Sequence, residues 1–453
     1  MSATAPLSPV PESLPSAPEV SVTPPAPEPE AWSPARRLAF RFAFAYLVLY
    51  SFPFPLDLIP ILGDFLNGLL EGLWKAAVPW FGKHVLRLST DITVMPNGSG
   101  DTTFNYVQVL LLFILAVVAT GVWSAVDRRR AQYMKANDLL NTNVRYVLAM
   151  AMLSYGLAKL FKSQFPFPSP ERLMQPLGDF SPMGLLWNFM GFSKGYNLFT
   201  GGAEFLGGCL LLFRRTTTLG AIVTAGVMVN VVALNFFYDV PVKLYSSHLL
   251  MMALFLVLPD ARRLLDVLLL NRATQPRALQ PPFPPSRWLT GAGVVMKLLV
   301  VGGIGYGFFN SRLDYIRKYG DDAQRPPFYG SYTIESFTQD GQPLDAASGD
   351  ARRWKAVAVN RFGRLNIKHQ DDSVKSFGLE EDAPKKTLTL IDDKDDTAKK
   401  FVLAYARPEA NQLILQGTLQ EAAIEVRLNR VDESKFLLLN RGFNWIQEYP
   451  FNR

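Results

Sequence analysis

The chain has 453 residues, of which 49% are hydrophobic and only 19% are charged. Soluble proteins usually carry about 25% charged residues, so this composition favours a membrane protein. The net charge of +7 belongs to the first 310 residues, because basic and acidic residues balance beyond that point. Arginines in short loops between membrane spans explain this excess without nucleic-acid binding. The lone Cys209 excludes an intrachain disulfide, a redox pair of cysteines and a cysteine-based metal site.

The first 34 residues are rich in proline, alanine, serine and glutamate. Such a segment cannot bury enough apolar surface to fold, so we expect a disordered cytoplasmic tail. Residues 35–310 are expected to form a transmembrane helical domain. Arg36, Arg37 and Arg41 precede its first apolar segment and place the N-terminus in the cytoplasm.

Residues 63–88 combine apolar residues at helical spacing with scattered charges, which predicts an amphipathic helix. We expect this helix to lie along the outer membrane surface, and a re-entrant helix is the alternative. Pro79 predicts a kink or a break in it.

Further apolar segments follow, and most of their cytoplasmic ends are marked by arginine clusters. The segments are 104–126, 144–162, 198–213, 216–238, 245–258 and 288–309. Together with the first segment they predict about seven spans, with the C-terminus outside the cytoplasm. Segments 198–213 and 245–258 are shorter than the ~20 residues that a span needs, so they could tilt or continue into the interface.

The pattern changes after residues 311–330, which we interpret as a linker. Short alternating or β-branched runs then recur about every ten residues, with glycine, aspartate and proline between them. This predicts an extracytoplasmic all-β domain over residues 331–453, built as an up-and-down barrel or a sandwich of about eight to ten strands. The runs are too short and too polar for a membrane barrel.

Glu204 is the carboxylate of a glycine-rich apolar segment that ends at Arg214 and Arg215. A carboxylate inside a membrane costs several kcal/mol unless it has a partner or water, so Glu204 is a candidate functional residue. At 1.5 Å per residue, Lys159 lies roughly 7–8 Å below the outer end of its span and Glu204 roughly 9 Å below the outer start of the next one, so their depths match. We therefore predict that Lys159 and Glu204 meet, either directly or through one group or water.

Other polar side chains are expected at the same outer level, and with the pair they define a candidate ligand pocket. They are Tyr155, Asn235, Tyr238, Asp239, Lys243 and His248. Each has a structural alternative: a lysine could snorkel, Asp239 and Lys243 could clasp a turn, His248 could cap a helix, and amides could bond between helices. The candidates for catalysis are Lys159, Glu204 and His248. Asn230 and Lys297 are also expected inside spans, and no metal site is predicted.

Two motifs resemble the core of a known family. Arg145 and Tyr155-Gly156-Leu157-Ala158-Lys159 are followed by Gly201-Gly202-Ala203-Glu204-Phe205-Leu206-Gly207-Gly208 and then by Arg214-Arg215. Residues 144–258 thereby resemble the four-helix core of the DoxX-like proteins. The resemblance implies a bacterial inner-membrane protein, in a group of which some members are linked to quinone-dependent sulfur oxidation. The additional N-terminal helices and the β domain depart from the family pattern, and the cysteine pairs of related quinone-reducing proteins are missing.

Three functions remain open from the sequence. The first is a quinone-linked redox subunit, whose electrons a partner protein would supply because the chain has no haem or iron–sulfur motif. The second is an inner-membrane envelope protein whose bundle or β domain binds a lipophilic ligand or a protein partner. The third is an acid–base enzyme with Lys159 as the base, similar only in architecture to vitamin K-dependent carboxylases.

Overall fold

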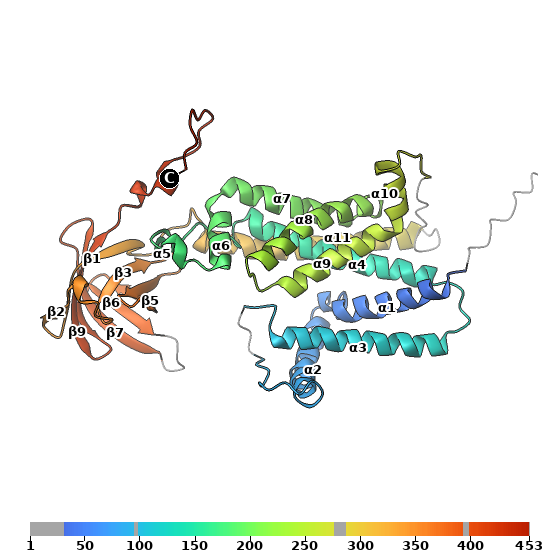
Figure 1. The fold of residues 1–453 in the computed structure, drawn as a ribbon, viewed down its shortest axis with the longest axis horizontal. Helices are drawn as coiled ribbons and strands as arrows, with labels where there is room; N and C mark the ends of the chain where they lie inside the picture. The colour runs from blue at the N-terminus through green and yellow to red at the C-terminus, as the bar shows by residue number, and fades with distance from the viewer. Residues whose placement is uncertain (1–30, 95–97, 276–286, 393–397, 453) are drawn as a thin grey trace, which may run out of the picture.

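A helical bundle and a β-barrel lie end to end along the long axis of the molecule (Figure 1). The computed structural model describes residues 31–94, 98–275, 287–392 and 398–452. Most of the expected N-terminal tail lies outside these residues. Its last part is anchored, because the Trp32 ring packs edge-on against Phe40 at 5.3 Å between centroids.

Long helices that run along the same axis make up the bundle (Figure 1). They are α1 (Pro34–Ser51), α3 (Thr103–Val126), α4 (Met134–Leu160), α7 (Lys194–Leu211), α8 (Thr217–Phe237), α9 (Lys243–Val257) and α11 (Arg287–Tyr319). Short helices join them or cap their ends: η1 (Leu56–Leu58), α5 (Pro170–Leu173), η2 (Leu177–Asp179), α6 (Pro182–Phe192), η3 (Arg214–Thr216), η4 (Leu258–Asp260) and α10 (Ala261–Leu268).

Four helical segments in the described part of the chain are long and apolar enough to cross a membrane. They are Pro34–Leu58, Thr103–Val126, Arg214–Phe237 and Lys243–Leu268. These segments support membrane association, but they are fewer than the seven spans expected from the sequence. Helices α4 and α7 lie in the bundle and fall outside the four, because charged residues such as Arg145, Lys159 and Glu204 lower their apolarity.

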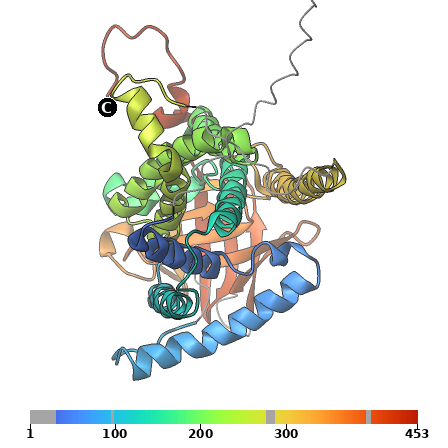
Figure 2. The same cartoon turned by 90° about the vertical axis from the view of Figure 1, so that its right-hand side faces the viewer.

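Helix α2 (Leu62–His84) runs across the direction of the bundle helices (Figure 2). Exposed Phe65, Leu69 and Leu73 line it, and this orientation favours a helix on the membrane surface over a re-entrant one. The predicted break at Pro79 is absent, since the helix continues through it to His84. A proline removes one backbone hydrogen bond and crowds the preceding turn, and the turns on either side of Pro79 keep the helix continuous despite this cost.

Helix α11 continues to Tyr319, so the first part of the expected linker at 311–330 is helical. No glycine or proline occurs between Ser311 and Tyr319, and Gly320 is the first residue that breaks the pattern. The first strand begins soon afterwards, at Gly330.

The C-terminal domain is a closed antiparallel barrel of eight consecutive strands with a short hairpin strand, β2, on its edge. The strands are β1 (Gly330–Gln339), β2 (Gln342–Pro343), β3 (Trp354–Val359), β4 (Arg364–His369), β5 (Val374–Asp382), β6 (Thr387–Asp392), β7 (Lys399–Ala406), β8 (Gln412–Leu419) and β9 (Ala422–Arg430). Strand β1 pairs with β9, for example Phe337 with Val426, and so closes the barrel. This confirms the predicted all-β domain and selects the barrel over the sandwich, the two architectures that the sequence left open. The short helices η5 (Ala346–Ser348), η6 (Glu433–Lys435) and α12 (Leu437–Asn440) lie outside its wall.

The interior of the barrel is filled with apolar side chains. Phe377, Leu388 and Leu390 are at most 1% exposed, and Phe328, which precedes β1, belongs to the same cluster. Alternation along each strand sends these residues inward and polar residues outward, as a small barrel requires.

Asp321, just after α11, joins the two domains. Its carboxylate accepts hydrogen bonds from Lys162 Nζ at 2.5 Å, from Arg361 Nη1 at 2.9 Å and from the Phe167 backbone N–H at 3.0 Å. Arg361 comes from the β3–β4 turn and its side chain is only 3% exposed. Partial burial by itself would raise the pKa of Asp321. Hydrogen bonds from Lys162 and Arg361 stabilise the carboxylate more strongly, so the pKa of Asp321 is lowered.

Candidate functional site

Glycines let α4 and α7 approach closely at the centre of the bundle. A Cβ atom at Gly156 would come within 2.7 Å of the Phe205 backbone nitrogen, and one at Gly201 within 2.7 Å of Lys159 Cβ. Gly208 is similarly tight against Leu153. Small residues at such spacing are the usual means by which membrane helices pack backbone to backbone.

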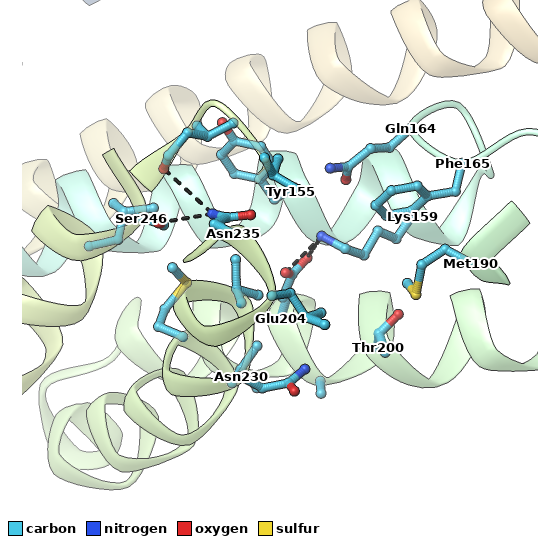
Figure 3. A pocket seen from close by; sticks show the side chains of 18 of the residues that line it. Tyr155, Lys159, Gln164, Phe165, Met190, Thr200, Glu204, Asn230, Asn235 and Ser246 are labelled. Carbon is cyan, nitrogen blue, oxygen red and sulfur yellow. Dashed lines mark hydrogen bonds and ion pairs between the residues drawn. The ribbon is translucent and has the colours of Figure 1, made fainter. Parts of the chain in front are cut away.

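The close approach brings Lys159 of α4 onto Glu204 of α7 (Figure 3). Lys159 Nζ donates to both carboxylate oxygens at 2.8 Å, and the two side chains are 8% and 3% exposed. The predicted buried pair is therefore present and direct. The ammonium group of Lys159 also lies over the rings of Tyr155 and Phe165, which adds a second favourable contact to its charge.

A cavity of about 490 Å³ lies beside this pair, between α4, α6, α7, α8 and α9. Its wall is mostly apolar, with Met152, Met190 and Met228 among the lining residues. Polar groups are few and come from different helices: Tyr155, Lys159, Gln164, Tyr196, Thr200, Glu204, Asn230, Asn235, Tyr245 and Ser246. A large apolar cavity with a few placed polar groups is the usual form of a small-molecule site.

The cavity reaches the side of the bundle between α7 and α8. Phe199 on α7 is 71% exposed, and Gly226 and Asn230 on α8 are exposed as well as lining the cavity. The Asn230 amide has no hydrogen-bond partner within the described residues. An unpaired amide on a membrane helix is costly, so this position favours a ligand that supplies the partner.

Four of the eight predicted ligand-binding residues come together in this cavity: Tyr155, Lys159, Glu204 and Asn235. Asn235 Nδ2 of α8 donates a hydrogen bond to Ser246 Oγ of α9 at 2.9 Å (Figure 3). The Asn235 amide therefore bonds between two helices, which was the structural alternative to ligand binding.

The other four predicted residues do not line the cavity. Tyr238 packs against the small cluster around Phe165. Lys243 pairs with Asp239, whose side chain is 82% exposed, at 2.9 Å. Asp239 and Lys243 therefore clasp the turn between α8 and α9, which was the structural alternative to ligand binding. Asp101 completes the turn by accepting the backbone N–H groups of Lys243 and Leu244.

His248 lies on the opposite side of α9, against α1. Its Nε2 is 2.7 Å from the Tyr46 hydroxyl, and its ring stacks on Tyr50 with 4.1 Å between centroids. Helix packing, rather than the cavity, accounts for this histidine. The side chain of Lys297 lies outside the described residues.

Sequence reasoning missed several lining residues, among them Gln164, Thr200, Tyr245 and Ser246. Gln164 lies in a loop just beyond α4, so its depth could not be read from helical periodicity. Ser246 could have been found from its position opposite Asn235 across the short outer turn. No group of three or more metal-ligating side chains is found among the residues that the structure describes.

Comparison with known proteins gives one informative match. The uncharacterized protein YwoB of Bacillus subtilis (strain 168) is 36% identical over 123 residues, which are 27% of this chain and 78% of YwoB. This chain belongs to the YwoB family. YwoB is described only as uncharacterized, so the similarity to it does not indicate an activity. No model of a known protein family and no solved structure matches the chain.

Proposed function

We propose that this protein is an integral membrane protein that binds one lipophilic molecule in the cavity beside Lys159 and Glu204. The observation that carries the proposal is a cavity of about 490 Å³ with a largely apolar wall that reaches the bundle surface between two helices. A ligand from the bilayer would enter sideways, through Phe199, Gly226 and Asn230, without crossing water. The polar end of the ligand would contact the Asn230 amide or the side chains of Lys159 and Glu204.

The barrel offers less room for such a ligand, because apolar side chains such as Phe377 and Leu390 fill its interior. Its outer wall faces the loop around α5 across a cleft of about 700 Å³. We therefore assign the lipophilic ligand to the bundle and leave the barrel the role of an extracytoplasmic cap.

A seven-span topology and a bacterial inner-membrane location form part of the proposal. The support is the arginine pattern, the DoxX-like motifs over residues 144–258 and the direction of the bundle helices (Figure 1). Helices α4 and α7 would cross as inner members of the bundle, where the paired charges are shielded from lipid.

Quinone is one ligand that this cavity would accept, because Tyr155, Asn230 and Tyr245 bring hydrogen-bond donors to its wall. The acid–base alternative has less support. Lys159 donates to both oxygens of Glu204, so a base at this position would first have to lose that partner.

The test is extraction of the purified protein followed by mass spectrometry and absorbance. Gly226→Leu fills the cavity, and a Cβ at Gly226 meets no atom within 4 Å, so the fold should tolerate it. Gly121→Leu on α3 is the matched control, since Gly121 is equally free of contacts and does not line the cavity.

We expect the unaltered protein and Gly121→Leu to retain a stoichiometric lipophilic molecule and Gly226→Leu to lose most of it. The absorbance spectrum of a quinone in the extract would identify the ligand as a quinone and would favour the redox function. Equal retention by all three proteins would show that the bound molecule does not occupy the cavity and would overturn the proposal.

A further inference from the structure

A second cavity of about 600 Å³ lies on the neighbouring face of α4, toward η1 and α11. Three residues, Tyr155, Gln164 and Tyr245, line both this cavity and the one beside the ion pair. The two spaces are therefore separated by no more than these side chains. A single molecule with two different ends could extend from one into the other.

The second cavity contains polar atoms that the protein leaves unsatisfied. Asp57 Oδ1 and Gln164 Oε1 are buried and have no hydrogen-bond partner among the residues that the structure describes. Arg312 lines the same cavity, and its guanidinium has no hydrogen bond or ion pair within the described residues. A buried acceptor or an unpaired guanidinium costs free energy unless a ligand or water satisfies it.

These groups lie beyond the apolar parts of two helices of the bundle. Asp57 lies in η1, a few residues beyond the end of α1 at Ser51, and Arg312 lies just beyond the apolar part of α11. Phe54, Met150 and Phe308 provide the apolar remainder of the wall. The cavity thus combines one cationic group, one anionic group and an apolar floor at the outer end of the bundle.

We infer that the second cavity binds the headgroup of a zwitterionic phospholipid. Arg312 contacts its phosphate, and the Asp57 carboxylate accepts a hydrogen bond from its ammonium group. One acyl chain passes Tyr155 and Tyr245 into the cavity beside Lys159 and Glu204. This inference rests on the proposed function and names the class of its ligand. A guanidinium suits phosphate because its N–H groups match the phosphate oxygens, and a lone carboxylate suits an ammonium.

The experiment compares lipid binding by native mass spectrometry after delipidation. The probes are phosphatidylethanolamine, phosphatidylglycerol, which lacks the ammonium, and diacylglycerol, which lacks the phosphate. Glycerophosphoethanolamine and inorganic phosphate, which have no acyl chains, serve as competitors. The variants are Arg312→Gln, Asp57→Asn and Arg317→Gln. Arg317 is the matched control, because it lies on the same helix, pairs with Asp314 and is 69% exposed.

We expect the unaltered protein and Arg317→Gln to prefer phosphatidylethanolamine. Arg312→Gln should weaken both phospholipids at least tenfold while leaving diacylglycerol unchanged. Asp57→Asn should remove the preference for phosphatidylethanolamine over phosphatidylglycerol. Glycerophosphoethanolamine should compete only at much higher concentration than the intact lipid.

Two results would overturn the inference. Binding that is lost in Gly226→Leu but unaffected by Arg312→Gln and Asp57→Asn would leave the proposed function intact and refute the headgroup site. Competition by inorganic phosphate as strong as that by phosphatidylethanolamine would show an anion site without a role for the chains. Failure of the proposed function itself would appear instead as lipid binding that Gly226→Leu does not change.

Discussion

The bundle and the barrel bury their interiors in opposite ways. The barrel core holds apolar side chains in contact from wall to wall, with Phe377, Leu388 and Leu390 almost fully buried. The bundle buries an ion pair and amides, and it keeps a cavity beside them. A filled core contributes stability, whereas a core with a cavity gives up part of that stability. The difference shows that room for a ligand lies in the bundle, whereas the barrel is packed as a rigid unit.

The largest expected effect comes from breaking the ion pair of the bundle. Lys159→Met or Glu204→Gln should each lower the free energy of unfolding by about 3–5 kcal/mol, because one charge remains buried without its partner. The double variant should lose less than either single one. Thermal unfolding in lipid nanodiscs would be measured for the unaltered protein, the two single variants and the double variant. Additive losses of stability would show that the two residues do not interact.

The barrel should respond to a change in its apolar core, even one that lies before its first strand. Phe328→Ala should cost about 3–5 kcal/mol, because Phe328 is 6% exposed and packs with the barrel cluster. The fragment 326–453 should consequently fold alone and be more stable to urea than the fragment 331–453. Phe443→Ala, at a side chain that is 78% exposed, is the control with little expected effect. Equal stability of both fragments would place Phe328 outside the folding unit.

The contact between the two domains at Asp321 should contribute less stability than the core of either domain. Asp321→Asn should cost about 1–3 kcal/mol of domain docking, because it weakens the bond to the buried Arg361 side chain. The expected readout is faster proteolysis between α11 and β1 while the barrel stays folded. Arg317→Gln, whose pair with Asp314 is exposed, should leave the cleavage rate unchanged.

The same junction should depend on pH. The pKa of Asp321 is lowered in the folded protein by Lys162 and Arg361, against a partial burial that would raise it. Its stabilising contribution is therefore complete above the pKa of the unfolded state, about 3.9, and is lost as the pH falls through the lower folded value. Proteolysis at the junction with an acid-stable protease should accelerate below about pH 4 in the unaltered protein but not in Asp321→Asn. An equal acceleration in both would assign the pH dependence to another group.

The smallest effect is expected at the turn between α8 and α9. Asp101→Ala should cost about 1 kcal/mol, because its carboxylate accepts the first free N–H groups of α9, from Lys243 and Leu244. Asp91→Ala, at a carboxylate that is 94% exposed, should change the unfolding temperature much less. Equal shifts in the two variants would show that the cap contributes no stability.

Regular patterns made much of this fold predictable from the sequence. Alternation over residues 331–453 indicated an all-β barrel or sandwich, and similar depths of Lys159 and Glu204 in antiparallel helices indicated the pair. His248 does not line the cavity, because depth alone does not say which face of a helix points at which neighbour, and here the face meets Tyr46 and Tyr50. Gln164 and Arg312 were not predicted as cavity residues, since their positions depend on a loop and on a helix extension that periodicity does not describe.

The most direct test of the account is photolabelling in the membrane with a fatty acid that carries a diazirine at the end of its chain. The account predicts that label concentrates on cavity residues of α7 and α8, such as Ala203 and Val227, and that excess unlabelled lipid displaces it. Label spread evenly over exposed apolar faces, including Val117 and Val118 of α3, and insensitive to competitor would contradict a ligand cavity in the bundle.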